Sequence, residues 1–286
     1  MNDMANRWSA GLTPAAALTL RAGFDDDAEV YQRTRPVCPP ALFDDLIRLA
    51  GLSPGDRVLE IAPGTGQATV PLAERGLAVT AVELGPSLAA VARRRLASFP
   101  AVEVVTSSFE DWQPRDDVSY DAVVVCNALH WIDAEVRYAK PAALLRPGSA
   151  FAIVSCQWAR PVRADPFWTE VQQDYLAVGF RGSPPPPPDQ VEPWRFPPAE
   201  SEAGFVETAS RRYPLAMTYS AADYLAQLST QAGTRELGPA RAADFLDRVR
   251  RRLDALGSPA LTATFVACLT IGTRRERPGS PGWMDP

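Results

Sequence analysis

From Arg57 to Ser155 the sequence alternates between short apolar runs and segments whose apolar residues recur at helical spacing. Such alternation predicts a parallel, doubly wound sheet with right-handed crossovers and helices on its faces. The run Tyr120–Cys126 is almost entirely apolar, which is typical of a central strand covered on both faces. We therefore expect an α/β fold, with a different pattern after Ser155.

The expected elements follow from periodicity, proline and glycine positions. Strands are predicted at 57–61, 77–82, 102–106, 120–126, 149–155, 206–215 and 261–273. Helices are predicted at 41–50, 67–75, 87–99, 135–145, 167–178, 221–231 and 240–256. This divides the chain into an N-terminal cap segment (1–40), a core (41–160), a substrate-side insertion (161–204), the last two strands with inserted helices (205–274) and a tail (275–286). The prolines at 184–188 predict a stiff surface loop within the insertion.

Composition excludes several classes of protein. The 29 basic and 34 acidic residues give a net charge of −5, which argues against a general nucleic-acid binder. The clusters at 93–95, 250–252 and 274–275 are expected to form solvated faces. Four cysteines without a CxxC pair indicate reduced, structural thiols, and one histidine cannot build a multi-histidine metal centre. With no signal peptide and no membrane-spanning apolar run, we expect a soluble, cytoplasmic protein without a resident metal.

The stretch Val58–Thr69 joins a strand to a helix through a turn that contains Gly64 and Gly66. Glycines let a backbone approach a ligand closely, and a helix start offers unpaired N–H groups to an anion. Glu60 lies in the strand before the turn, and Glu83 ends the next strand. A carboxylate in the position of Glu83 suits a ribose diol, because it can accept from both hydroxyls.

A dinucleotide site is disfavoured by the same stretch. Such a turn would carry a third glycine or an alanine where this chain has Thr69, and it seldom has an acid at the position of Glu60. An ordinary strand–turn–helix without a ligand remains the alternative.

These motifs resemble those of class I S-adenosylmethionine (SAM)-dependent methyltransferases over about residues 31–155. The family's ExGxGxG motif is present as Glu60, Ala62, Gly64 and Gly66, with alanine replacing the first glycine. The resemblance implies a Rossmann-like, mostly parallel seven-stranded sheet with an antiparallel last strand and a helical cap. It also implies that the turn holds the amino-acid part of SAM. The residues that it assigns to the cofactor are Tyr31, Arg35, Glu60, Ala62, Gly64, Gly66, Glu83, Leu84, Ser108, Phe109, Glu110 and Asn127.

Three of these assignments, Ser108, Phe109 and Glu110, concern adenine, because the segment from Ser107 to Trp112 resembles the family's adenine-recognition segment. The family often has aspartate where this chain has Ser108, whose hydroxyl can still accept from the adenine amino group.

Closer still, the chain is similar to small-molecule methyltransferases that include trans-aconitate-type carboxyl methyltransferases. The shared marks are Tyr31, Arg33, Arg35 and Pro36 before the first helix, and Asn127–Asp133 after the fourth strand. The resemblance implies that Tyr31 and Arg35 close over SAM, with the arginine near its carboxylate.

The acceptor side is expected around His130, Trp131 and Trp158. His130 follows the fourth strand, where open α/β sheets bind ligands, and an imidazole can act as a base or orient an oxygen. Trp131 can line the pocket. The alternative is that His130 and Trp131 pack beneath the cofactor or cap a helix at Asp133, and that Trp158 only packs the cap.

We therefore expect a methyltransferase that acts on an oxygen of a small metabolite or natural product. The alternatives are a SAM-binding scaffold without methyl transfer and, less favoured, a nucleic-acid or protein methyltransferase. Against nucleic acid, the residues after the fourth strand are Asn127-Ala128-Leu129-His130, without the Pro-Pro-aromatic motif that resembling base-flipping enzymes carry.

Overall fold

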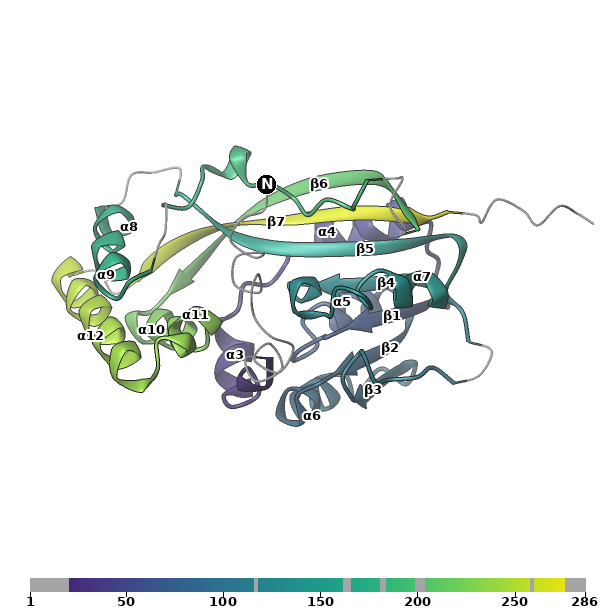
Figure 1. Ribbon diagram of the computed structural model, residues 1–286, viewed down its shortest axis with the longest axis horizontal. Helices are drawn as coiled ribbons and strands as arrows, with labels where there is room; N and C mark the ends of the chain where they lie inside the picture. Colours follow the sequence, from purple (N-terminus) through teal and green to yellow (C-terminus); the bar gives the residue numbers. More distant parts are fainter. Residues whose placement is uncertain are drawn as a thin grey trace, which may run out of the picture.

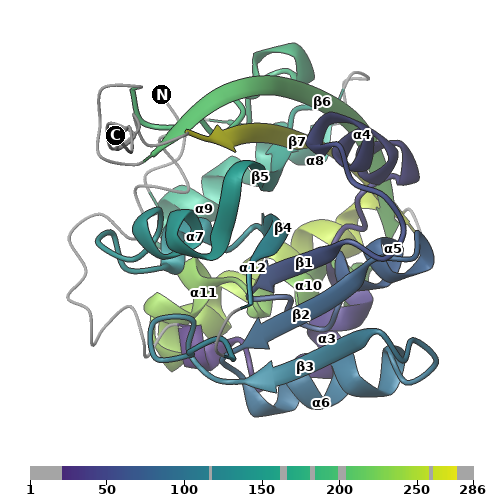
Figure 2. The same ribbon diagram turned by 90° about the vertical axis from the view of Figure 1, so that its right-hand side faces the viewer.

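The computed structural model describes residues 21–115, 118–161, 166–180, 184–198, 204–257 and 260–275. They contain a seven-stranded sheet in the order β3-β2-β1-β4-β5-β7-β6, which Figure 2 shows as one curved layer. The strands are β1 (Arg57–Ile61), β2 (Ala78–Glu83), β3 (Val102–Thr106), β4 (Tyr120–Cys126), β5 (Leu145–Ala159), β6 (Phe205–Tyr219) and β7 (Leu261–Arg274). Neighbours from β3 to β5 are parallel, whereas β7 is antiparallel to both β5 and β6. The predicted α/β class and the antiparallel last strand are thus confirmed.

The helices agree with the predicted ones in place more than in length. They are α3 (Ala28–Thr34), α4 (Pro40–Ala50), α5 (Thr69–Glu74), α6 (Pro86–Arg95), α7 (Ala139–Leu144), α8 (Pro166–Glu170), α9 (Gln172–Ala177), α10 (Ala221–Ser229), α11 (Ala232–Glu236) and α12 (Pro239–Leu256), with 3-10 turns η1 (Leu129–Trp131) and η2 (Pro188–Gln190).

Two predicted helices are wrong in detail. The helix expected at 135–145 begins only at Ala139, and Leu145 already pairs with Tyr120 as the first residue of β5. The helix expected at 167–178 divides at Val171 into α8 and α9. The short helices α3 and α11 were not predicted. Of the predicted tail, only Arg275 is among the described residues.

Apolar side chains cover both faces of the parallel strands, which explains the continuous apolar runs in the sequence. On one face Leu42, Phe43 and Leu46 of α4 pack with alternate residues of β1, β2, β4 and β5. On the other face Phe151 packs with residues of β1 and β4 and with the 109–112 and 194–196 segments. This double coverage is what a parallel sheet requires.

The strands β5, β6 and β7 are longer than predicted and extend beyond the core. Figure 1 shows them running toward a group of helices at one end of the molecule, α8, α9, α10 and α12. There a separate apolar cluster joins Trp158 of β5 and Phe265 of β7 to these helices. The helices therefore form a cap attached to the sheet by its own long strands.

The chain order reverses at β1, which has β2 on one side and β4 on the other. In doubly wound sheets a crevice opens at this point, outside the carboxyl ends of the strands, and ligands bind there. A ligand site is therefore expected at the carboxyl ends of β1, β2 and β4 and in the segments packed over them.

Candidate cofactor and acceptor site

The turn after β1 has a backbone that few side chains tolerate. Gly64 and Gly66 have φ angles of 61° and 80°, and Ala62 also has a positive φ of 52°. A Cβ added to Gly66 would lie 3.3 Å from Leu96 Cδ1, so this glycine also allows α6 to approach. The left-handed angle of Ala62 explains why the resembling motif has glycine there, because a side chain costs energy in this region.

Beneath this turn lies Glu60, whose side chain is fully buried. Neither of its carboxylate oxygens has a hydrogen-bond partner, and the same holds for the buried Thr65 and Thr69 hydroxyls and for Gln67 Nε2. Burial and, to a smaller extent, the charge of Glu83 raise the pKa of Glu60 to about 7, although the nearby Thr69 hydroxyl, which lies outside hydrogen-bond geometry, opposes this. Unpartnered buried polar atoms are rare and call for an explanation, such as a ligand that completes them.

Glu83 connects the ends of β1 and β2. Its Oε2 accepts a hydrogen bond from the Gly64 amide at 2.8 Å, and its Oε1 accepts one from the Gly85 amide at 2.8 Å. Burial raises the pKa of this carboxyl, and the two amide bonds oppose that effect. Each carboxylate oxygen can accept a second hydrogen bond, so Glu83 keeps the capacity to bind a diol.

Residues 21–35 lie across this end of the sheet. Tyr31 Cε1 is 3.5 Å from where a Cβ on Gly64 would be, and the Arg35 guanidinium carbon lies 4.6 Å from the Tyr31 ring centre. Arg35 donates to the carbonyl and hydroxyl oxygens of Thr230, while its buried Nε has no partner. The structure thus brings Tyr31 to the glycine turn and Arg35 to Tyr31, and leaves one guanidinium donor unused.

The segment after β3 is held by its own polar side chains. Ser108 Oγ donates to Asp111 Oδ2 and accepts from the Asp111 amide, so its hydroxyl is engaged within the turn. Glu110 forms a two-bond ion pair with Arg21 and accepts from the Asp133 amide. Phe109 is buried. The Glu110 carboxylate therefore anchors the N-terminal segment to this turn.

After β4 the chain turns at Asn127, which has a left-handed φ of 56°. Its Oδ1 accepts a hydrogen bond from the Cys156 amide of β5, so the side chain fixes the turn. In η1, His130 lies against Trp131 with ring centres 4.9 Å apart, and Trp131 contacts Phe24 of the N-terminal segment. Burial, with the nearby Arg137, lowers the pKa of His130 to about 4, so the imidazole is neutral.

Trp158 lies apart from this group. Its ring packs 4.4 Å from the Phe265 ring and 5.6 Å from the Trp168 ring, centre to centre, inside the cap cluster. The other predicted residues gather around β1, β2, β4 and the N-terminal segment. Leu84, between Glu83 and Gly85, is half-buried at the end of β2.

Several residues of this region carried no signal in the sequence. Asp25 Oδ1 accepts from the Leu88 amide at the start of α6, and Arg95 Nη1 donates to the Thr65 carbonyl of the turn. Arg93 likewise donates to Val104 O and Thr106 Oγ1 of β3. Arg93 and Arg94 are exposed, as predicted, whereas Arg95 is half-buried and bonded to the glycine turn.

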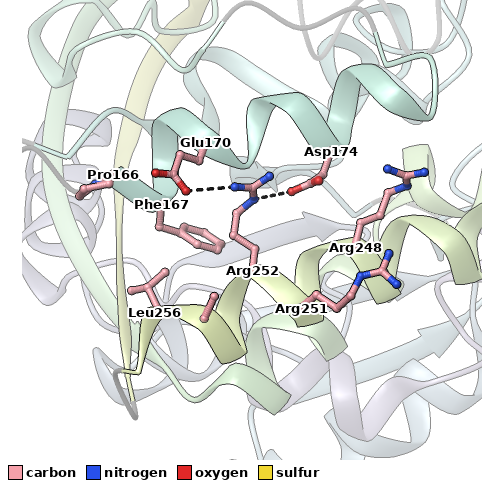
Figure 3. Close-up of a pocket in the computed structure, with 9 residues that line it drawn as sticks. Pro166, Phe167, Glu170, Asp174, Arg248, Arg251, Arg252 and Leu256 are labelled. Atoms are coloured by element: carbon pink, nitrogen blue, oxygen red, sulfur yellow. Dashed lines mark hydrogen bonds and ion pairs between the residues drawn. The ribbon is translucent and has the colours of Figure 1, made fainter.

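A cavity of about 630 Å³ lies elsewhere, in the cap. Figure 3 shows Arg252 of α12 reaching into it between Glu170 and Asp174, with which it forms ion pairs of 3.0 and 2.6 Å. None of the predicted site residues lines this cavity. Arg252 is half-buried and its ion pairs to Glu170 and Asp174 join α8 and α9 to α12.

Comparison with known proteins identifies the core. Residues 58–148 match a family model described as a methyltransferase domain. This part of the chain is therefore similar to methyltransferase domains. The match spans β1 to the start of β5, and so includes both acids and the glycine turn.

The relatives agree with this assignment. An uncharacterized methyltransferase of Mycobacterium tuberculosis is 37% identical over 135 residues, which cover 47% of this chain and 52% of that protein. A demethylmenaquinone methyltransferase of Clavibacter sepedonicus is 33% identical over 148 residues, covering 50% and 59%. The chain thus spans about half the length of the curated relatives that it matches.

Solved structures extend the likeness to the whole fold. A protein of Anaeromyxobacter dehalogenans, proposed to be a type II methyltransferase, has a TM-score of 0.57 at 25% identity, covering 84% of this chain and 97% of that one. The YcgJ protein of Bacillus subtilis has a TM-score of 0.50 at 16% identity, covering 83% and 99%, and so shows the fold alone.

Within the described residues, no helix combines the length and apolar character of a membrane span. Those residues also bring no three metal-ligating side chains together.

Proposed function

We propose that the protein is a SAM-dependent methyltransferase that acts on a small-molecule acceptor, with a carboxylate oxygen as the acceptor atom. The observation that carries the cofactor is the set of unpartnered buried groups around the glycine turn, above all the Glu60 carboxylate. SAM offers an ammonium to Glu60, a carboxylate to Arg35 and a ribose diol to Glu83. Glu60 has no hydrogen-bond partner, Arg35 has one unused donor, and each Glu83 oxygen can accept a second hydrogen bond.

When bound, SAM supplies an electrophilic methyl group on a sulfonium. The protein then has to orient the acceptor and exclude water, which can supply about 7–11 kcal/mol of the barrier reduction. Tyr31 and Trp131, linked through Phe24, are placed to cover the site from the N-terminal side. We propose that Ser108, Phe109 and the backbone around Glu110 hold the adenine.

The environment of His130 supports a carboxylate acceptor. An efficient general base has a pKa near the working pH, and the pKa of His130 is about 4. A phenol or amine would have to lose a proton, whereas a carboxylate needs no base. We therefore propose that neutral His130 contacts or orients the acceptor and does not deprotonate it.

We further propose the location and substrate class of the protein. It is a cytoplasmic enzyme that acts on a small metabolite or natural product and is similar to trans-aconitate-type carboxyl methyltransferases. Its support is the four free cysteines, together with the residues shared around Tyr31 and Asn127. We propose that Trp158 does not contact the acceptor and affects its binding only by stabilising the cap.

The test combines binding with turnover. Isothermal calorimetry should detect S-adenosylhomocysteine binding to the wild-type chain, and Glu83→Ala should abolish it. Labelled SAM is then offered with a panel of small carboxylic acids, phenols and RNA. Labelled methyl esters without proton release support the proposal; a proton released per turnover indicates a hydroxyl acceptor. Binding without transfer to any acceptor would indicate a scaffold and contradict the proposed activity.

A further inference from the structure

Lys140 is the only lysine of the chain, which has 29 basic residues in all. It lies in α7, a helix that packs against β5, and its side chain reaches the segment after β3. The sequence pattern assigned no role to it. Every other basic residue of the chain is arginine. The contacts of Lys140 therefore indicate whether this position needs an ammonium group and not a guanidinium group.

The Lys140 ammonium meets three backbone carbonyls of one turn. Nζ donates to Phe109 O at 2.7 Å, to Glu110 O at 3.1 Å and to Trp112 O. An ammonium has three donors, and all three are used here. Desolvation lowers the pKa of Lys140, and the nearby Glu110 charge opposes that effect.

The geometry explains why an arginine would not replace it. A guanidinium spreads its donors in a rigid plane, whereas an ammonium directs three donors from one point. The carbonyls of Phe109, Glu110 and Trp112 converge on such a point. The Lys140 ammonium also lies 5.0 Å from the Phe109 ring centre and 5.8 Å from that of Trp112, adding cation–π attraction.

Without Lys140 the backbone of the turn has few other hydrogen bonds, although the Phe109 and Trp112 rings are buried in the core. It contains one backbone hydrogen bond, from the Trp112 amide to Ser108 O, and the local Ser108–Asp111 contacts. Glu110 ties the turn to Arg21 and to the Asp133 amide, but through its side chain. Lys140 is thus the side chain that bonds three backbone carbonyls of this turn, those of Phe109, Glu110 and Trp112.

We infer that Lys140 is a positioning residue that shapes the backbone of residues 109–112 into the adenine-binding wall of the cofactor site. The inference rests on the proposed function, because it needs SAM as the cofactor. It concerns the adenosine half of the ligand alone, since Lys140 contacts neither the glycine turn nor Glu60 among its recorded partners.

The experiment separates the two halves of the ligand. Binding of S-adenosylhomocysteine and of 5′-methylthioadenosine, which lacks the amino-acid part, is measured by calorimetry for wild type, Lys140→Met, Lys140→Arg and Glu60→Gln. We expect Lys140→Met to weaken both ligands by a similar factor of about ten, and Lys140→Arg to lie between it and wild type. Glu60→Gln should weaken only S-adenosylhomocysteine.

A second measurement does not depend on a variant that folds. Lys140 carries the chain's only side-chain amine, so its acylation by an amine reagent can be followed by mass spectrometry in the wild-type protein. Both ligands should slow this acylation, because they order the turn. The inference is overturned if Lys140→Met binds 5′-methylthioadenosine within twofold of wild type, or if bound ligands leave acylation unchanged. Wild type that binds neither ligand would instead refute the proposed cofactor.

Discussion

Replacement of Glu60 by glutamine should change how the stability of the ligand-free protein depends on pH. The pKa of this fully buried carboxyl is about 7, against an ordinary value of 4.5. The folded protein therefore holds a proton between these two values that the unfolded chain has already lost. The free energy of unfolding consequently falls as pH rises through this window, by about 3 kcal/mol in total at 1.36 kcal/mol per pKa unit.

Glutamine cannot ionise, so Glu60→Gln removes this loss. Between pH 5 and pH 8 the stability of the variant relative to wild type should rise by about 2.5 kcal/mol, since part of the loss has occurred by pH 5. Urea unfolding of both proteins at the two pH values, without cofactor, measures this double difference. Any constant effect of the amide cancels in it.

Glu74→Gln is the matched control, because Glu74 is exposed near the end of α5, the helix that follows the same turn. Its double difference should be close to zero. A Glu60→Gln value below about 0.5 kcal/mol would refute the reasoning, because it would mean that the carboxyl ionises freely inside the fold. Conversely, the wild-type affinity for S-adenosylhomocysteine should increase as pH rises toward 8, because the ligand's ammonium needs the ionised carboxylate.

Three further outcomes follow from single residues. Ala62→Gly should raise the free energy of unfolding by about 1 kcal/mol in urea, because the positive φ of Ala62 costs a side chain more than glycine's extra freedom costs the folded state; a loss of stability would contradict this. Glu83→Gln should weaken S-adenosylhomocysteine at least tenfold by calorimetry, since an amide presents one acceptor where the carboxylate presents two; unchanged affinity would remove Glu83 from the site. With a carboxylic-acid acceptor, kcat should stay level between pH 6 and pH 8.5, because neutral His130 has a pKa of about 4; an inflection near pH 6.5 that His130→Gln removes would show that it is a base.

The core of this fold can be predicted from the sequence because its buried strands are short, continuous apolar runs. β1, β3 and β4 have their predicted bounds, and each is a short apolar run ended by a polar or turn residue. The extensions of β5 and β6 were missed since their outer residues, such as Trp158, pack with cap residues distant in sequence. No local period reports such a contact.

The candidate site also contains residues that the sequence predicts and residues that it does not. The glycine turn and Glu83 are recognisable because backbone angles and strand ends constrain residue type. Arg21 and Asp25 contact residues 89 and 63 positions further along the chain, and Lys140 contacts a residue 31 positions before it. Only folding brings these residues together. Glu110 and Ser108 were assigned to the cofactor from resemblance, and their side chains are also engaged in holding their own turn.

The pairing of β6 with β7 has a consequence for how the acceptor side can change. Tyr219, the last residue of β6, pairs directly with Leu261, the first residue of β7, and α10, α11 and α12 lie between them in the chain. The two ends of this helical excursion are thus neighbours in the sheet. Segments with adjacent ends can be exchanged, shortened or lengthened at small entropic cost to the rest of the chain. Exchange of this one excursion would therefore leave the register of β1, β2 and β4, whose ends carry the glycine turn, Glu83 and Asn127, unchanged.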